Sequence, residues 1–244
     1  MLHGFGDTPQ TLGILGDRIA EAGFRVRAPL FPGHGRTPQE FFVSTATEWV
    51  ASARDSLLEM RSLCSSVAVV GLSMGGAIGV LLAAEFTDMP ALVLLSPYVR
   101  MPLRLWLAAA THRTWGPLAG SLYSRHPESI RDPDERKKNR GYGVINGHAL
   151  GELSRIVDWS RSALGQVTCP TLLVQSRKDP RIRPSIAIEA LRLLGAPKRK
   201  LVWVDDGGHI ISVDYGREKV FNETIAWLLA NQTGQPTPPQ QATA

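Results

Sequence analysis

Signatures of several large protein classes are missing from this sequence. Its two cysteines, Cys64 and Cys169, are too few for a disulfide scaffold, so we expect two buried free thiols. The longest strongly apolar stretches, such as residues 89–95, fall far short of the roughly 20 residues that cross a bilayer. The first residues have neither the basic start nor the apolar stretch of a signal peptide, and we therefore expect a cytoplasmic protein.

Nucleic-acid binding also lacks its usual signatures, although the chain is basic. The net charge of +5 comes entirely from residues 98–165, which contain eleven Arg and Lys against six Asp and Glu, whereas the rest contains sixteen of each. Because no helix-turn-helix, zinc or aromatic-platform pattern accompanies this charge, we expect no nucleic-acid partner. We interpret the surplus as a solvated helical surface, with weak contact to an anionic membrane surface as the alternative.

What the sequence does contain is the size and alternation of an α/β domain. With 244 residues, 43% of them hydrophobic, the chain can build one large core. Short apolar runs alternate with helical patterns, which predicts a mostly parallel, doubly wound sheet. The expected strands are residues 24–31, 66–72, 91–95, 171–176 and 200–204, and the expected helices after the first are residues 45–63, 75–86, 185–194 and 217–229.

Local capping signals mark several helix boundaries. Thr8 followed by Pro9 predicts the start of the first helix. Thr45 and Glu48 have the spacing of a capping box. Gly195 suits the end of the helix that precedes it. We interpret these helices as structural.

The alternation stops after residue 97 and resumes near residue 170, which indicates an insertion. We predict an α/β core formed by residues 1–97 and 166–230 and a small helical cap formed by residues 98–165. Residues 231–244, rich in Gln, Pro and Thr, are predicted to be a disordered tail. The sequence leaves open whether the protein is a monomer or a homodimer.

The strongest chemical signal is a serine between glycines, in the pentapeptide Gly71-Leu72-Ser73-Met74-Gly75. It follows a β-branched apolar run and precedes a helical pattern. A serine on a tight strand-to-helix turn has a strained backbone, and side chains two residues before and after it would collide. Gly71 and Gly75 remove these collisions, so we predict that Ser73 is a nucleophile.

A serine nucleophile needs a base that accepts its proton. In a parallel sheet, functional groups gather beyond the carboxyl ends of the strands. His209 follows the expected strand 200–204 through a glycine-containing loop, and we predict that it is the base. We interpret His3 and His34 as residues that organise loops. The remaining histidines fall in the insertion and are interpreted as surface or cap residues: His112, His126 and His148.

The base in turn needs a carboxylate that fixes its tautomer. Asp179 follows the expected strand 171–176, and the order Ser73, Asp179, His209 is the one found in α/β-hydrolases. Asp205 and Asp206 compete for this role, but they are too close to His209 in sequence to orient it easily. We therefore prefer Asp179.

The oxyanion that forms on attack needs two donors, usually backbone amides. Met74, directly after the nucleophile, supplies one from the helix N-terminus. The second should come from a loop near the first strand, and residues 3–6 form the only glycine-flanked candidate. We predict that the amide of Phe5 is this second donor.

These features together resemble the α/β-hydrolase superfamily, and more closely its microbial carboxylesterase and monoacylglycerol lipase-like branch. The resemblance covers nearly the whole chain. Beyond the serine motif, it rests on residues 3–5 (HGF), 28–35 (APLFPGHG), 174–179 (VQSRKD) with Pro184, and 207–214 (GGHIISVD).

The resemblance implies a catalytic triad of Ser73, Asp179 and His209, an acyl-enzyme intermediate, no metal and no organic cofactor. Phe5 and Met74 match the oxyanion positions of the family. A small cap is also implied over the acyl pocket. We expect this pocket to be lined by Leu103, Trp106 and Leu107.

One feature departs from the resemblance. In relatives an apolar strand precedes the His-Gly pair and lies between the strands that correspond to residues 24–31 and 66–72, whereas here only Met1 and Leu2 stand in its place. Without that strand, two central strands lose a neighbour or pair with each other. We therefore expect that the natural protein has residues upstream of Met1.

We predict a serine carboxylester hydrolase that cleaves small to medium acyl esters, with monoacylglycerols among the candidates. The alternatives that use the same triad are a lipase proper, a C–C bond hydrolase and a perhydrolase. Two further alternatives are a ligand-binding receptor with negligible turnover and an interaction protein that uses its basic cap on anionic surfaces. Because Ser73 stands where epoxide and haloalkane hydrolases have aspartate, those two reactions are disfavoured.

Overall fold

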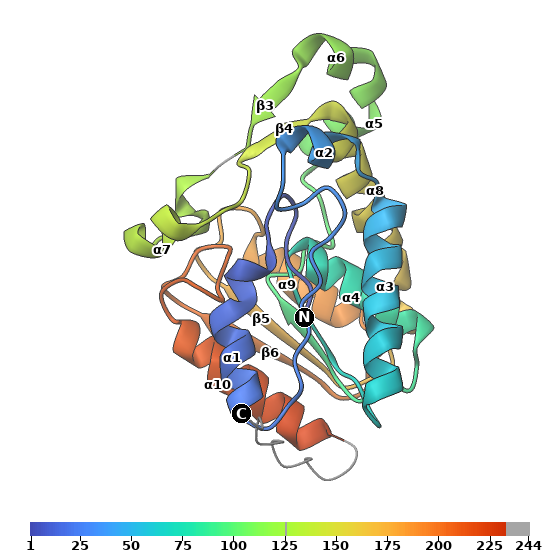
Figure 1. Ribbon diagram of the computed structural model, residues 1–244, viewed down its shortest axis with the longest axis vertical. Coiled ribbons are helices and arrows are strands. Elements are labelled where there is room, and N and C mark those ends of the chain that lie inside the picture. Colours follow the sequence, from blue (N-terminus) through green and yellow to red (C-terminus); the bar gives the residue numbers. More distant parts are fainter. Residues whose placement is uncertain (125, 233–244) are drawn as a thin grey trace, which may run out of the picture.

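A four-stranded parallel sheet forms the centre of the computed structural model, which describes residues 1–124 and 126–232 (Figure 1). Its strands are short apolar runs, and in three of the four every residue is buried, as expected where helices cover both faces. The predicted parallel sheet is therefore confirmed. The order of its strands is β1 (Val69–Leu72), β2 (Leu92–Leu95), β5 (Thr171–Ser176) and β6 (Arg199–Val204).

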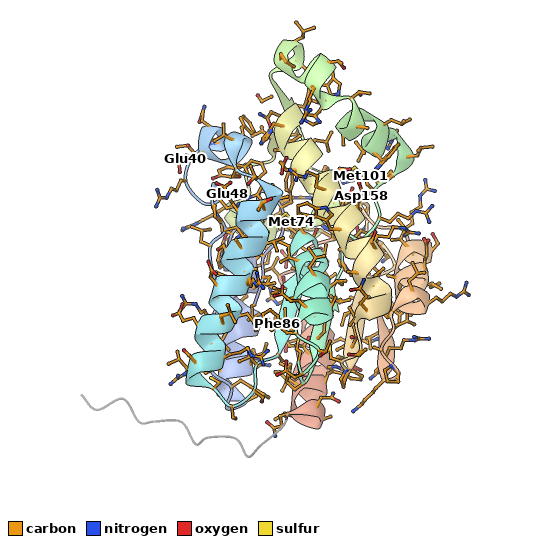
Figure 2. All side chains as sticks on the ribbon, turned by 90° about the vertical axis from the view of Figure 1, so that its right-hand side faces the viewer. Glu40, Glu48, Met74, Phe86, Met101 and Asp158 are labelled. Atoms are coloured by element: carbon orange, nitrogen blue, oxygen red, sulfur yellow. The ribbon has the colours of Figure 1, made fainter. Side chains whose placement is uncertain are left out.

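Helices cover the two faces of this sheet in separate layers. One layer holds α3, α4 and α8, which lie side by side in Figure 2, together with α9, and the other holds α1 and α10. The buried apolar side chains divide into two clusters, one on each face of the sheet. The bounds of these helices are α1 (Gly13–Glu21), α3 (Ala46–Leu63), α4 (Met74–Glu85), α8 (Gly147–Ala163), α9 (Pro184–Leu193) and α10 (Arg217–Asn231).

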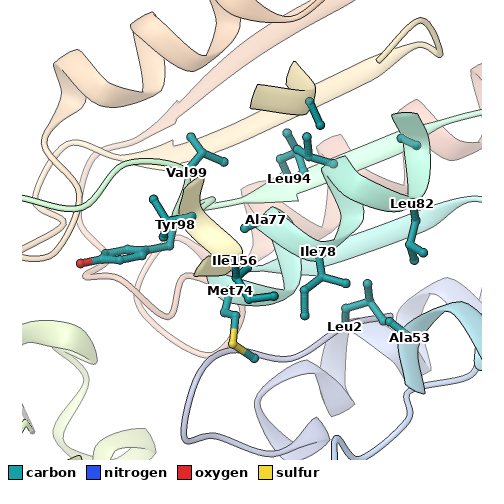
Figure 3. Close-up of a cluster of buried hydrophobic side chains, with 14 of the residues drawn as sticks. Leu2, Ala53, Met74, Ala77, Ile78, Leu82, Leu94, Tyr98, Val99 and Ile156 are labelled. Atoms are coloured by element: carbon teal, nitrogen blue, oxygen red, sulfur yellow. The ribbon is translucent and has the colours of Figure 1, made fainter. Parts of the chain in front are cut away.

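The helix that follows the serine motif, α4, is buried almost all round. Gly79 lets it approach the sheet, since a Cβ there would lie 3.2 Å from Leu92 and 3.3 Å from Val69. On its outer side α4 packs against α8, and Figure 3 shows Ile156 of α8 beside Met74 at the start of α4. The second half of the insertion therefore belongs to the helical layer beside the sheet.

The outer edge of β1 differs from what the sequence predicts. Residues 24–31 form no strand, although the apolar pattern predicts one. Leu2 bridges to β1 instead, donating to Val70 (2.8 Å) and accepting from Leu72 (2.9 Å). Beyond this bridge a cavity of about 140 Å³ separates residues 24–29 from β1. Toward this edge, the only backbone hydrogen bond found for residues 24–31 among the described residues runs from the Met1 ammonium to the Arg27 carbonyl, so no ladder of a strand forms.

Only some of the predicted helix caps are found in the structure. The box of Thr45 and Glu48 is confirmed, with both reciprocal hydrogen bonds present. Thr8 precedes a 3₁₀ helix (Pro9–Leu12) that leads into α1, but its side chain makes no cap hydrogen bond. Gly195 does not have the left-handed backbone of a glycine C-cap. Its small size matters for packing, because a Cβ there would lie 2.2 Å from the Gly165 carbonyl oxygen.

The first half of the insertion projects at one end of the molecule (Figure 1). As expected it is mostly helical, but it also contains a short antiparallel pair, β3 with β4, that the sequence did not predict. Its elements are α5 (Leu103–Ala110), α6 (His112–Ala119), β3 (Ser121–Tyr123), a 3₁₀ turn (Pro127–Ser129), α7 (Pro133–Lys138) and β4 (Val144–Asn146), with α2 (Pro38–Val43) of the core nearby.

Three further sequence predictions concern single features. Cys169 is buried, Cys64 is half-buried, and both are free thiols. Of the tail predicted to be disordered, residues 233–244 lie outside the described residues. Within the described ranges, none of the helices has the length and apolar character needed to span a bilayer.

Candidate active site

Ser73 lies on a strained turn between β1 and α4. Its φ is 54°, and Ser96 is the only other non-glycine residue with positive φ in the described part of the chain. The turn is held by hydrogen bonds on both sides of the serine: Ser73 donates to the Leu95 carbonyl (2.9 Å), and its own carbonyl accepts from Ala77 and Tyr98 (3.1 Å each). The hydroxyl is thereby presented at the carboxyl end of the sheet, where the sequence predicts it.

The two glycines of the motif fill roles that no other residue can fill. A Cβ at Gly71 would lie 2.3 Å from the carbonyl oxygen of Gly75. A Cβ at Gly75 would lie 2.1 Å from the Leu2 carbonyl oxygen and 2.6 Å from that of His3. The predicted collisions are thus confirmed, and the second of them is with the segment that leads into residues 3–6.

The structure brings Ser73, His209 and Asp179 into one hydrogen-bonded chain. The Nε2 atom of His209 lies 2.8 Å from Ser73 Oγ, and its Nδ1 atom lies 2.8 Å from Asp179 Oδ2. Because a carboxylate only accepts, Nδ1 carries the proton and Nε2 is free to accept from the serine. The side chains of Asp179 and His209 are 0% and 10% exposed, so water competes little for these bonds.

Asp179 is held in place by its own loop. Its Oδ1 atom accepts from the backbone N–H groups of Arg181 (2.7 Å) and Ile182 (3.0 Å), and its Oδ2 atom also accepts from Gln175 (2.8 Å). Burial by itself would raise the pKa of this carboxyl. The interaction with His209 and the two amides outweigh burial and hold the pKa below its usual range. Asp179 is therefore a fixed anion beside the imidazole.

The two competing acids lie elsewhere. Asp205 pairs with Arg177 and Asp206 pairs with Lys178, at 3.0 Å in both cases. The two carboxylate side chains are 66% and 72% exposed. Neither has a hydrogen bond to His209 among the contacts of the described residues, and both are engaged in surface ion pairs.

Two backbone amides near Ser73 are unengaged. Met74 is the first residue of α4, so its N–H has no partner within the helix. In residues 1–124 and 126–232 no acceptor is found for the N–H of Met74 or of Phe5. The loop that carries Phe5 lies against the serine, since a Cβ at Gly4 would be 3.5 Å from Ser73 Cβ. These are the two amides that the sequence predicts as oxyanion donors.

His3 and His34 organise the loop that carries Phe5, as expected. The Nε2 atoms accept from the backbone N–H of Phe31 and of Gly6 respectively, at 3.1 Å in each case. Burial lowers the pKa of His3 to about 3 and that of His34 to about 4. Both rings are therefore neutral near pH 7, which is what accepting an N–H requires.

Asp7 is a buried acid near the site that no motif predicts. Its carboxylate accepts from Thr8 N (2.8 Å) and Thr11 Oγ1 (3.0 Å). Burial raises its pKa to about 6, and the hydrogen bonds from Thr8 and Thr11, together with a smaller attraction to His209, offset part of that effect. The only sequence signal was its position directly after residues 3–6.

The predicted cap residues are not gathered at the triad. Leu103, Trp106 and Leu107 lie on α5 with exposures of 71%, 41% and 50%. No described hydrogen bond, ring contact or core cluster joins them to Ser73 or His209. Among the described residues, no three His, Cys, Asp or Glu side chains are grouped to hold a metal ion.

A parallel sheet that presents a strained serine, a histidine and an aspartate at the carboxyl ends of its strands defines an α/β-hydrolase fold. Comparison with known proteins gives the family. The Hydrolase_4 family, described as serine aminopeptidase, S33, matches residues 1–215, and the chain belongs to this family. Its relatives place it in the esterase and monoacylglycerol lipase-like branch of the α/β-hydrolases, so it is an esterase- and lipase-like serine hydrolase.

Similar proteins include the thermostable monoacylglycerol lipase of Bacillus sp. (strain H-257). It is 25% identical over 228 residues, which cover 93% of this chain and 88% of the relative. A solved structure from work on LipS and LipT, two metagenome-derived lipolytic enzymes, has a TM-score of 0.86 and 26% identity, covering 94% and 91% of the two chains. The Paleococcus ferrophilus monoacylglycerol lipase has a TM-score of 0.81 and 21% identity, covering 95% and 93%.

Proposed function

We propose that this protein is a serine carboxylester hydrolase that cleaves small to medium acyl esters, monoacylglycerols among them, through an acyl-enzyme intermediate. The observation that carries the proposal is the hydrogen-bonded chain from Ser73 Oγ through His209 to Asp179. The choice of an ester as substrate is supported by relatives that are named a monoacylglycerol lipase and a carboxylesterase.

In the proposed acylation step, Ser73 Oγ attacks the carbonyl carbon while His209 Nε2 takes the serine proton. Asp179 stabilises the imidazolium that forms. When the tetrahedral intermediate collapses, the alcohol leaves with the proton from His209, and the acyl group stays on Ser73. A water molecule then attacks the acyl-enzyme by the same route, which releases the acid and restores the serine.

The negative charge that develops on the carbonyl oxygen is assigned to the N–H groups of Phe5 and Met74. Both are fixed before substrate arrives, one by the start of α4 and the other by the loop that His3 and His34 hold. Preorganised donors of this kind each contribute about 10²- to 10³-fold to the rate of acyl transfer. General base catalysis by His209 contributes about 10²- to 10⁴-fold more.

The cap supplies a surface for a lipid substrate. Exposed apolar side chains gather on α5, α6 and β3, and we name this surface the cap crest: Leu103, Trp106, Leu107, Leu118 and Tyr123, with Arg104 and Arg113 between them. We propose that the first three contact the acyl chain of the substrate. The crest as a whole makes weak contact with an anionic lipid surface.

The basic run at the C-terminal end of α7 is less suited to lipid contact than its charge suggests. Lys137 pairs with Asp134 (3.0 Å), and Lys138 pairs with Glu135 (2.9 Å). Arg104 and Arg113 on the crest have no ion pair within the described residues. The crest therefore carries two cations that remain free to attract phosphate groups, while at α7 the two lysines are paired and only Arg136 and Arg140 have no ion pair within the described residues.

A p-nitrophenyl ester series of rising acyl length, followed by monoacylglycerols, tests the proposed function. The wild-type protein is expected to turn over the shorter and medium esters. Ser73→Ala should lose this activity while its unfolding midpoint stays close to that of the wild type. Equal activity in the variant would refute Ser73 as the nucleophile, and a folded wild-type protein inactive on every ester would refute the esterase proposal.

A further inference from the structure

The loop that carries His209 is joined to the base of the cap by one buried carboxylate. Asp214, only 1% exposed, accepts four backbone N–H groups. Two come from the His209 loop itself and two from cap residues 82 and 83 positions earlier in the chain. The donors are Asp132 and Tyr215 on Oδ1 (2.8 Å each) and Arg131 and Gly208 on Oδ2 (2.7 Å each).

A second set of contacts presses the same cap segment against the backbone of His209. The Ser129 carbonyl accepts from the N–H groups of both His209 and Ile210, at 2.9 Å each. The approach is so close that a Cβ at Gly208 would lie 2.0 Å from the Glu128 carbonyl oxygen. Glycine at position 208 is therefore required by the cap and not by the conformation of its own loop.

The cap segment also reaches the loop that carries the acid. Arg181 donates from Nη2 to the Ser124 carbonyl (2.6 Å) and from Nε to Ser129 Oγ (3.2 Å). Its backbone N–H holds Asp179 (2.7 Å). The two loops that place His209 and Asp179 are thus both in contact with described residues of the cap: Ser124, Ser129, Arg131 and Asp132.

We propose that Asp214 is a positioning residue for His209, acting by tying the His209 loop to cap residues 128–132. The proposal rests on the proposed function, because it assigns His209 the role of base. The base of the cap is then a fixed part of the catalytic site, while α5, α6 and β3 lie outside this link. Since a misplacement of about 1 Å in catalytic groups can cost 10²-fold in rate, loss of the link should lower turnover rather than substrate binding.

The first test is Asp214→Asn, which replaces one acceptor oxygen by an NH₂ group that faces two N–H donors. We expect kcat to fall by about 10- to 100-fold with KM changed less than about twofold. The matched control is Glu152→Gln. Glu152 is another buried carboxylate, 7% exposed, that accepts a backbone N–H from Ala46 (2.9 Å) away from the His209 loop. The control should keep the wild-type kcat at a temperature where both variants are folded.

A spectroscopic readout separates positioning from activity. The proton between His209 Nδ1 and Asp179 Oδ2 should give a low-field proton resonance, because the bond is 2.8 Å long and buried. We expect this resonance to broaden or disappear in Asp214→Asn and to remain in Glu152→Gln. If the wild-type protein hydrolyses no ester, the proposed function fails, while the resonance still decides whether Asp214 positions His209.

A second pair of variants leaves Asp214 intact, in case its replacement prevents folding. Asp132 has φ −62°, which proline adopts, and its side chain caps α7. Asp132→Pro removes the cap and the N–H to Asp214, whereas Asp132→Ala removes only the cap. We expect Asp132→Pro to have a kcat at least about threefold below that of Asp132→Ala. Equal kcat in this pair, or an unchanged kcat and resonance in Asp214→Asn, would overturn the proposal.

Discussion

Gly75, in the first turn of α4, lies against the backbone of Leu2. A Cβ on Gly75 would be 2.1 Å from the Leu2 carbonyl oxygen. Leu2 is itself fixed, because it bridges to β1 through Val70 and Leu72. Both backbones are therefore held in place, Gly75 by α4 and Leu2 by its bridge to β1. The contact therefore sets the distance between the serine turn and the loop that carries Phe5.

Gly75→Ala is expected to destabilise the protein by about 3 kcal/mol or more, since the added methyl group meets backbone rather than a movable side chain. Any folded fraction should lose most of its esterase activity because the Phe5 amide is displaced. The matched control is Gly13→Ala at the start of α1, where nothing lies within 4 Å of the added Cβ. That variant should be unchanged or more stable by about 0.5 kcal/mol. Urea unfolding followed by tryptophan fluorescence measures both, and equal stabilities would contradict the steric argument.

Asp179→Asn is expected to lower kcat by up to about 10⁴-fold with little change in stability. The amide can donate to His209 Nδ1, which moves the imidazole proton to Nε2 and removes the acceptor that Ser73 needs. Asp205→Asn is the control, since that carboxylate is exposed and paired with Arg177. Breaking such a surface pair costs less than about 1 kcal/mol and should leave kcat within twofold. A larger loss in Asp205→Asn than in Asp179→Asn would exchange the roles of the two acids.

The parts of the site that could be predicted from sequence are those whose cause is local. Gly71 and Gly75 stand next to the serine whose turn they permit, and the capping box of Thr45 and Glu48 lies within one helical turn. Asp179 lies three residues after the end of a strand, where a functional acid is expected. In each case the physical cause acts between residues a few positions apart, so it is visible in the sequence pattern.

The parts that could not be predicted depend on contacts between distant segments. Residues 24–31 have the composition of a strand, but a strand also needs a ladder of hydrogen bonds to a neighbour, and among the described residues only Met1 donates to the backbone of this segment from the side of β1. The four N–H groups around Asp214 converge only when the cap docks on the His209 loop. Thr8 is a residue type that can cap a helix, but its side chain makes no cap hydrogen bond in the structure. Residue type shows which hydrogen bonds a side chain can make, and the surrounding structure decides which ones form.

The buried neutral ring of His34 predicts a loss of stability in acid. Its pKa is about 4 in the folded protein against an ordinary 6.5. Between those values the unfolded chain binds a proton that the folded chain does not, so the free energy of unfolding falls as the pH falls through this window. The limiting slope is about 1.4 kcal/mol per pH unit for one group.

His34→Gln should flatten that slope, because glutamine can accept the Gly6 N–H without titrating. Like His34, His3 makes the free energy of unfolding fall as the pH falls. Asp7, with its pKa raised to about 6, makes the free energy of unfolding rise as the pH falls from about 6 to 3.8. Both are present in the two proteins, so the difference between them reports His34 together with its electrostatic effect on the pKa of His3. Urea unfolding at pH 7, 6 and 5 measures the difference, and parallel slopes would show that folding does not lower the pKa of His34.

The proposed contact between the cap crest and a lipid surface can be tested on its apolar side chains. Leu118 and Tyr123 are 90% and 77% exposed, so inserting them into a membrane surface removes apolar area from water without unpacking the core. The double variant Leu118→Ser with Tyr123→Ser should weaken binding to vesicles of phosphatidylglycerol and phosphatidylcholine. Leu63→Ser is the control, since Leu63 is 56% exposed at the far end of α3, outside the crest.

The charged part of the same contact is tested by salt. Arg104→Gln with Arg113→Gln should lower the affinity for anionic vesicles by about 1 kcal/mol per residue at low salt, and the deficit should shrink as salt rises. Lys137→Gln with Lys138→Gln should have a smaller effect, because both lysines already pair with carboxylates on α7. Vesicle co-sedimentation at rising salt compares the two pairs. An unpaired arginine can bind a lipid phosphate directly, whereas a paired lysine must first leave its carboxylate. If the lysine variants nevertheless weaken binding more than the arginine variants, α7 and not the crest faces the lipid.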